Sequence, residues 1–261
     1  MNSVPIFDSL THPTISSDWI LPRYPKRAKI HELLKGMEEN NVQWAFAVGM
    51  KGIGGYNEEK YIQLVNYHSD RLRSIAYFDP NDFKNLKDIQ KKLRHIKRIG
   101  YAGIKLHPRI SNFNLNYNIA TIIKAANDIQ LLPLLCTYPY SKNNARFINP
   151  DSLMDFLVLL EDAKVVLLHS GAVRLLEYME IARVFNNVLL DLSLTLCKYE
   201  DSSIDTDIRF LFKHFDKRIC IGSDFPEFSL RKLRERFELF SDKIPKEKKE
   251  NIAHRNILNF F

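Results

Sequence analysis

The 261-residue chain contains no apolar run close to the roughly 20 residues that a membrane-spanning helix needs. Its first residues, MNSVPIFDSL, also lack the basic region and the apolar core of a secretory signal. We therefore expect no membrane contact and place the protein in the cytoplasm. With 45% hydrophobic and 26% charged residues, the composition is that of a soluble globular chain with ample material for a core.

Cysteine is scarce. The three residues Cys136, Cys197 and Cys220 each lie in or beside an apolar run, and none is part of a C-x-x-C motif. An odd number without such spacing argues against a disulfide framework and fits a reducing compartment. Packing in the core is the default interpretation, and Cys136 is the exception considered below because of its position at the end of an apolar run.

Two motifs of common enzyme classes are also missing. The GIGG segment at residues 52–55 lacks the G-x-G-x-x-G spacing of a phosphate-binding loop, so we expect a flexible loop there. Ser170 and Ser223 lack the G-x-S-x-G spacing of a nucleophile elbow, which argues against a serine hydrolase.

The chain is basic, with a net charge of +7, and the densest basic stretch covers residues 84–98. Leu86, Ile89, Leu93 and Ile96 recur there at helical spacing, which predicts an amphipathic helix with a solvated basic face. No base-stacking aromatic pattern or known module accompanies the charge, so we expect no nucleic-acid partner. An anionic small-molecule substrate is the milder interpretation of the same charge.

Eight short apolar runs alternate with helical patterns along the chain, and most lack strict polar–apolar alternation, as strands buried on both faces do. The runs cover residues 4–10, 42–48, 72–78, 102–106, 132–137, 165–168, 188–194 and 218–222. The helical patterns cover residues 27–40, 58–67, 83–99, 118–130, 152–162, 173–185, 205–215 and 230–240. This rhythm predicts parallel strands joined by helical crossovers, in an α/β fold. Eight units fit a single-domain (β/α)₈ TIM-type barrel over residues 1–261, with an extra C-terminal helix at 246–260.

Several of the runs end in ionisable residues. Because the carboxyl ends of barrel strands meet at one rim, we expect His12, His107, His169 and Asp224 to converge there. In strict alternation Asp8, Leu10 and His12 would share one face of the first strand. Imidazole and carboxylate groups together suit a divalent metal such as zinc, with a bound water whose proton a nearby carboxylate takes.

Four segments and the chain's end are similar to motifs of the amidohydrolase-related (amidohydrolase 2) family. They are Asp8 to His12 (strand-1 motif D-x-H-x-H), residues 103–108 (strand 4), residues 166–171 (strand 6), residues 222–226 (strand 8) and residues 251–258 (C-terminal helix). The resemblance covers the chain from end to end. It implies a distorted (β/α)₈ barrel and a metal-dependent hydrolase or decarboxylase.

The sequence departs from the family pattern at two metal-ligand positions. Leu10 stands where the first histidine of H-x-H binds the metal, and Cys136 stands at the strand-5 histidine position. The resemblance thus implies a metal set of His12, Asp224 and Cys136, holding one divalent ion, zinc as the best match. The alternative is a site without metal.

Some relatives in the superfamily hydrolyse lactones without metal, with the strand-8 aspartate as base for water. By this resemblance Asp224 activates water, and His169 and His107 orient or polarise the scissile carbonyl. Of the two substrate-binding residues, Arg109 holds a substrate carboxylate and Lys105 offsets the charge of an oxyanion. The leading hypothesis is a hydrolase of a small carboxylate-bearing ester, lactone or amide. A decarboxylase of the same family and a non-catalytic barrel that binds a metabolite or partner are the alternatives.

Two positions near the rim have a structural alternative. A lysine inside a strand often pairs with a neighbouring carboxylate, and for Lys105 that partner is Asp8. Trp19 and Tyr24 follow the first strand and are candidates to cover the pocket, although aromatic packing is the default. A homo-oligomer is compatible with the sequence but not specified by it.

Overall fold

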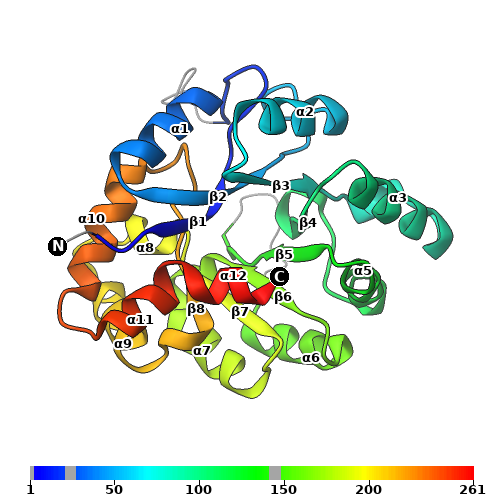
Figure 1. Cartoon of the computed structure of the whole chain (residues 1–261). Coiled ribbons are helices and arrows are strands. Elements are labelled where there is room, and N and C mark those ends of the chain that lie inside the picture. The colour runs from blue at the N-terminus through cyan, green and yellow to red at the C-terminus, as the bar shows by residue number, and fades with distance from the viewer. Residues whose placement is uncertain (1–2, 21–27, 141–147) are drawn as a thin grey trace.

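The computed structural model describes residues 3–20, 28–140 and 148–261 and contains one sheet of eight parallel strands. The strands pair in chain order around a ring (Figure 1). Their bounds are β1 Ile6–Thr11, β2 Val42–Val48, β3 Leu72–Tyr77, β4 Gly103–Leu106, β5 Leu132–Cys136, β6 Val165–Leu168, β7 Val188–Asp191 and β8 Ile219–Cys220. This order confirms the predicted (β/α)₈ barrel.

The ring closes where the segment after β8 runs beside β1. The Asp224 N–H donates to the carbonyl oxygen of Leu10 at 2.9 Å, and the His12 N–H donates to that of Phe225 at 2.7 Å. Gly222 permits this approach, because a Cβ atom there would lie 2.9 Å from the backbone nitrogen of Leu10. The seam of the barrel therefore lies beside two predicted site residues, His12 and Asp224.

Helices follow the strands and form an outer layer around the ring (Figure 1). The longer ones are α1 Ile30–Glu39, α2 Glu58–His68, α3 Leu86–Arg98, α5 Tyr117–Asp128, α6 Pro150–Leu160, α7 Leu175–Val184, α9 Ile204–His214 and α10 Leu230–Ser241. Short helical turns are η1 Pro80–Asp82, α4 Pro108–Ser111, η2 His169–Arg174, α8 Thr195–Lys198 and η3 Asp216–Arg218. In α3 Leu93 and Ile96 are buried and the basic residues Lys91 and Arg94 are exposed, as the sequence predicts, whereas Leu86, at the start of the helix, is exposed. None of the helices in the described ranges has the length and apolar character to cross a bilayer.

The predicted C-terminal helix is present as α11 Lys246–Glu250, a π-helical turn η4 Asn251–Arg255 and α12 Asn256–Phe260. The amide of Asn256 donates to the carbonyl oxygen of Ile219, where β8 begins, at 2.7 Å. Ile257 packs with the strand residues inside the ring. The C-terminal segment thus covers the end of the barrel where the strands begin (Figure 1), opposite the rim with the predicted site.

The interior of the ring is filled by apolar side chains from every strand except β4. Leu10 and Phe7 both belong to this cluster, although they are three residues apart, and the register of β1 against β2 shifts between Asp8 and Thr11. The expected alternation along the end of β1 is therefore wrong, because an irregularity of the strand interrupts it. The side chain of Lys105, on β4, is buried as well.

Candidate functional site

The predicted site residues all lie at or next to the ends of strands on one rim. His12 follows β1, Lys105 is in β4, His107 follows β4, and His169 and Asp224 follow β6 and β8. Each of these residues is at most 7% exposed. The structure brings them together in two groups, one around His12 and one around Cys136.

In the first group Lys105 and Asp224 contact the same nitrogen of His12. Nζ of Lys105 lies 3.1 Å from Nε2 of His12, and Oδ1 of Asp224 lies 3.5 Å from it. Nδ1 of His12 lies 2.8 Å from the carbonyl oxygen of Val48, which can only accept, so Nδ1 carries a proton. Burial, together with the charge of Lys105, lowers the pKa of His12 to about 4. His12 is therefore neutral, and its Nε2 accepts a hydrogen bond from Lys105.

Asp224 is ionised in this environment. Burial by itself raises the pKa of the carboxyl group, but the charges of His169 and Lys105 act against it, and the pKa is held well below its usual range. The backbone of Asp224 has a φ of 56°, a left-handed conformation that costs a residue other than glycine about 1–2 kcal/mol. Such strain occurs often at functional sites, where the surrounding structure enforces it.

The second group surrounds Cys136, the last residue of β5. Leu168 pairs with Cys136 across β5 and β6, which places His169 beside it. Leu106 pairs with the residue before Cys136, which places His107 on the other side. Both imidazoles influence the pKa of the Cys136 thiol. The register of the parallel strands therefore sets a thiol between two histidines.

The backbone assigns opposite roles to these two imidazoles. Nδ1 of His107 accepts a hydrogen bond from the Ile110 N–H at 3.3 Å, so the proton of the neutral ring is on Nε2. Nδ1 of His169 lies 3.1 Å from the carbonyl oxygen of Ser193 and carries the proton itself. In the neutral state Nε2 of His107 therefore carries a proton, whereas Nε2 of His169 has a free lone pair.

The charges within this group favour an ion pair. Burial alone would raise the pKa of the Cys136 thiol, but the charge and hydrogen bonds of His107 and His169 hold it well below its usual range. Burial opposes the imidazolium form of His169, yet the hydrogen bond with Cys136 and the charges of Cys136, Asp224 and Asp191 raise its pKa. For His107 burial outweighs the thiol, and its pKa is lowered.

Sequence reasoning missed Asp191, the last residue of β7. Its carboxylate accepts hydrogen bonds from the hydroxyl groups of Ser9 and Ser193 and, at 3.2 Å, from the backbone N–H of His169. Because the Ser193 hydroxyl donates to Asp191, its oxygen can accept from Nδ1 of His169, 3.2 Å away. The signal was present, since the apolar run of β7 ends in a carboxylate as the run of β8 does.

The suggested pairing of Lys105 with Asp8 does not occur. The amine of Lys105 contacts His12, whereas Asp8 accepts hydrogen bonds from the backbone N–H and the hydroxyl of Ser223. Burial raises the pKa of Asp8 to about 7. Asp8 is thus part of the seam of the barrel.

Arg109 lies on the outer side of the Cys136 group. Its guanidinium is stacked 4.8 Å from the ring centre of Tyr138, and its Nη1 donates to the carbonyl oxygen of Tyr140 at 3.2 Å. Nε of Arg109 is buried and has no hydrogen-bond partner in the described residues. Lys198 lies 4.7 Å from the same ring, whose edge meets His169. Two cations therefore flank the aromatic side chain beside the site.

Trp19 stacks on His12, with ring centres 5.1 Å apart and planes inclined by 20°. Its indole N–H donates to the Glu227 carboxylate at 2.9 Å. Trp19 thus covers the His12 group, as the sequence suggested, and Tyr24 lies outside the described residues.

The side chains expected to bind a metal do not fit one. Leu10 offers no ligand atom, the lone pair of His12 Nε2 faces the Lys105 amine, and Cys136 lies in the other group, between His107 and His169. Within the ranges that the structure describes, no group of three or more His, Cys, Asp or Glu side chains could hold a metal ion. A divalent cation at His12 would also meet the positive charge of Lys105.

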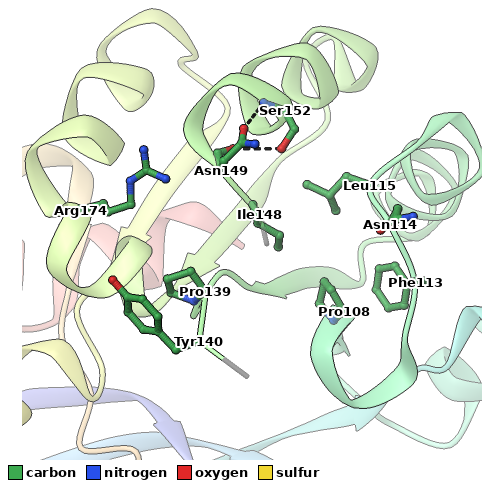
Figure 2. A pocket seen from close by; sticks show the side chains of 10 residues that line it. All are labelled: Pro108, Phe113, Asn114, Leu115, Pro139, Tyr140, Ile148, Asn149, Ser152 and Arg174. Carbon is green, nitrogen blue, oxygen red and sulfur yellow. Dashed lines mark hydrogen bonds between the residues drawn. The ribbon is translucent and has the colours of Figure 1, made fainter. Parts of the chain in front are cut away.

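A cavity of about 510 Å³ lies next to the rim, beyond β4 and β5 (Figure 2). Pro108 and Pro139 border it, and Pro108 directly follows His107. Figure 2 shows Arg174 and Tyr140 on one side of this cavity and Phe113 across from them. The remaining lining residues are Asn114, Leu115, Ile148, Asn149 and Ser152. The two groups of ionisable residues are not part of its lining.

A family model described as "Amidohydrolase" matches residues 34–261. No curated protein matches the chain in sequence. In structure, the chain is similar to an uncharacterized TIM-barrel protein from Bordetella bronchiseptica, with a TM-score of 0.80 and 15% identity over 98% of each chain. It is also similar to enamidase, with a TM-score of 0.69 and 13% identity over 98% of this chain and 67% of that one. For a dihydroorotase the TM-score is 0.59 and the identity 15%, over 98% and 69% of the chains.

Proposed function

We propose that this chain, which belongs to the amidohydrolase family, hydrolyses a small carboxylate-bearing ester, lactone or amide without a metal ion. The family match confirms the resemblance seen in the sequence motifs, and members of the superfamily generally use divalent metals. In this proposal the buried ammonium group of Lys105 supplies the positive charge that a metal supplies in those members.

The observation that carries the proposal is the position of Lys105. Its amine lies 3.1 Å from His12 Nε2, the nitrogen that would bind the metal in the family pattern, and Asp224 contacts the same nitrogen. Burial lowers the pKa of Lys105, whereas the charges of Cys136 and Asp224 oppose that shift. An ammonium in such a dry site can offset a developing oxyanion.

Asp224 is the base in this proposal. Its carboxylate, ionised and held at the seam, takes the proton of an attacking water. Lys105 stabilises the oxyanion that forms on the carbonyl, while His107 and His169 orient the substrate at the opposite side of the rim. The reaction adds one water across the acyl bond and releases a carboxylic acid with an alcohol or an amine.

Arg109 supports the choice of an anionic substrate. Its Nε is buried without an acceptor, and a buried donor without a partner costs about 1–3 kcal/mol. A substrate carboxylate would supply the missing acceptor and could accept a second hydrogen bond from the same guanidinium. Lys198, whose amine donates a hydrogen bond to the hydroxyl of Tyr138, adds to the positive potential of the rim.

The test is hydrolysis by chelator-treated protein of a panel of lactone carboxylates and succinate monoesters. We expect turnover without added metal, and a loss of roughly 10²–10⁴-fold in Asp224→Asn. Asp216→Asn is the matched control, because Asp216 is equally buried but pairs with Lys248 away from the rim.

Each other outcome contradicts the proposal. Turnover that requires zinc would show that the site binds a metal after all. Full activity of Asp224→Asn would show that Asp224 is not the base. Release of carbon dioxide from the carboxylates would indicate the decarboxylase. Tight binding of a panel member that stays unaltered would indicate a barrel that binds without catalysis.

A further inference from the structure

We propose that the cavity beyond β4 and β5 is a second ligand site, separate from the reacting rim, and that it binds an aromatic carboxylate. The inference does not depend on the proposed hydrolase, because the two groups of ionisable residues do not line this cavity. It rests on the size of the cavity, on its apolar walls and on the side chain of Arg174.

Four connections of the barrel meet around the cavity. Its lining includes Phe113 and Leu115 from the segment between α4 and α5, Pro139 after β5, Ile148 before α6 and Arg174 at the end of η2. The volume of about 510 Å³ lies in the range of pockets that enclose a small molecule. Connections held by the rigid scaffold of a barrel are also where binding residues are usually found.

The walls of the cavity are apolar and fixed in place. Figure 2 shows Phe113 and Leu115 across from Ile148 and Pro139. Phe113, Leu115 and Ile148 are half-buried and pack against the core of the barrel. An aromatic ring placed between these side chains would bury apolar surface on both the ligand and the protein, which favours binding.

The polar groups of the lining favour an anion. Arg174 is the one charged side chain that the described residues contribute to the lining. Its Nε and Nη2 donate to the Glu177 carboxylate at 2.9 Å each, which leaves Nη1 without a partner in the described part of the chain. Oδ1 of Asn149 accepts from the Ser152 N–H at 2.7 Å, so the amide nitrogen of Asn149 remains as a second donor. A ligand carboxylate would supply acceptors for these donors.

The ion pair between Arg174 and Glu177 leaves room for a ligand. The two side chains are 37% and 51% exposed, and an exposed pair of this kind contributes little to stability. An incoming carboxylate can therefore share the guanidinium with Glu177 or take its place.

A hollow beside α3 provides the contrast. It is lined mainly by charged side chains of both signs, among them Asp82, Asp88, Lys91 and Arg94. Mixed charges of this kind are typical of a solvated surface. The cavity at Arg174 combines apolar walls with a single sign of charge instead, which is the composition of a site for an amphipathic anion.

2-Naphthoate is a suitable probe because it carries one carboxylate on a flat aromatic ring system. In calorimetric titration of the full chain we expect one site, with at least tenfold weaker binding of the neutral 2-naphthamide. Arg174→Gln should weaken binding of 2-naphthoate roughly 10–100-fold, because a charge-assisted hydrogen bond is lost. Glu177→Gln breaks the same ion pair but should strengthen binding roughly 2–5-fold, because it frees the guanidinium for the ligand.

The matched control is Arg183→Gln. Arg183 lies on the next helix, α7, and pairs with Glu180 at 3.5 Å, but it does not line the cavity, so its substitution should leave binding unchanged. Unfolding midpoints verify the fold of each variant. Absence of binding, equal binding by all variants, or equal weakening in Arg174→Gln and Glu177→Gln would overturn the proposal. Weakening in Arg109→Gln with none in Arg174→Gln would place the carboxylate at the rim, which refutes the second site and leaves the proposed hydrolase intact.

Discussion

Ser223 donates two hydrogen bonds to the buried carboxyl group of Asp8, one from its backbone N–H at 2.9 Å and one from its hydroxyl. The two residues come from opposite ends of the chain and join the last strand of the barrel to the first. Burial still outweighs these bonds and raises the pKa of Asp8 to about 7. The closure of the barrel is thus linked to the protonation of one residue.

The variant Asp8→Asn tests this linkage. A group whose pKa is raised on folding contributes stability at low pH and loses it as the pH rises through the folded value. Between pH 5 and 7 we expect wild type to lose about 2–3 kcal/mol relative to Asp8→Asn, which has no ionisable group there. Urea unfolding of both proteins over this range measures the difference, and parallel profiles would show that Asp8 ionises normally.

His12 gives the opposite dependence on pH. Its pKa is lowered to about 4 in the fold, so the unfolded chain binds the proton more tightly between pH 6.5 and 4. We expect wild type to lose about 3 kcal/mol relative to His12→Gln as the pH falls through that range. NMR titration of the imidazole provides a direct control. A midpoint near the normal value would contradict the neutral, buried state.

Arg109 should act on substrate binding more than on chemistry. In Arg109→Gln we expect KM for mono-4-nitrophenyl succinate to rise roughly 10–100-fold, because charge-assisted bidentate hydrogen bonds to a carboxylate are lost. The neutral ester 4-nitrophenyl butyrate serves as the control and should be hydrolysed with unchanged KM. An equal effect on both esters would assign Arg109 to packing on Tyr138 instead.

Asp191→Asn should lower kcat with little change in KM. The amide cannot accept all the hydrogen bonds that Asp191 accepts from Ser9, Ser193 and the His169 backbone, so His169 loses its fixed orientation. We expect kcat to fall roughly 10²-fold. The acidic side of the profile of kcat against pH should also move to lower pH, because the negative charge that raises the pKa of His169 is gone. A stability loss with unchanged kcat would make the role structural only.

The barrel and its rim could be predicted from the sequence because both depend on local patterns. Each buried strand is a short apolar run, so His169, directly after a run, and Asp224, two residues after one, must lie near its end. The prediction from sequence was less accurate at β1, where the register against β2 shifts between Asp8 and Thr11. No local pattern encodes that shift.

The proton positions at the site could not be predicted for the same reason. They depend on partners outside the motifs, such as the carbonyl oxygens of Val48 and Ser193. The contact between Lys105 and His12 likewise requires the registers of all the strands between β1 and β4. Sequence therefore indicated which residues gather at the rim, whereas their division into two groups required coordinates.

Because the proposed site lies on the seam between β1 and β8, its activity should depend on closure of the barrel. His12 and Asp224 are held by the same backbone hydrogen bonds that complete the circle. We expect a chain whose seam has opened to keep its helices and its other strand pairs, but to separate His12 from Asp224. On heating, activity should therefore be lost before the helical signal in circular dichroism decreases. A screen for turnover would then also select chains whose barrel is closed.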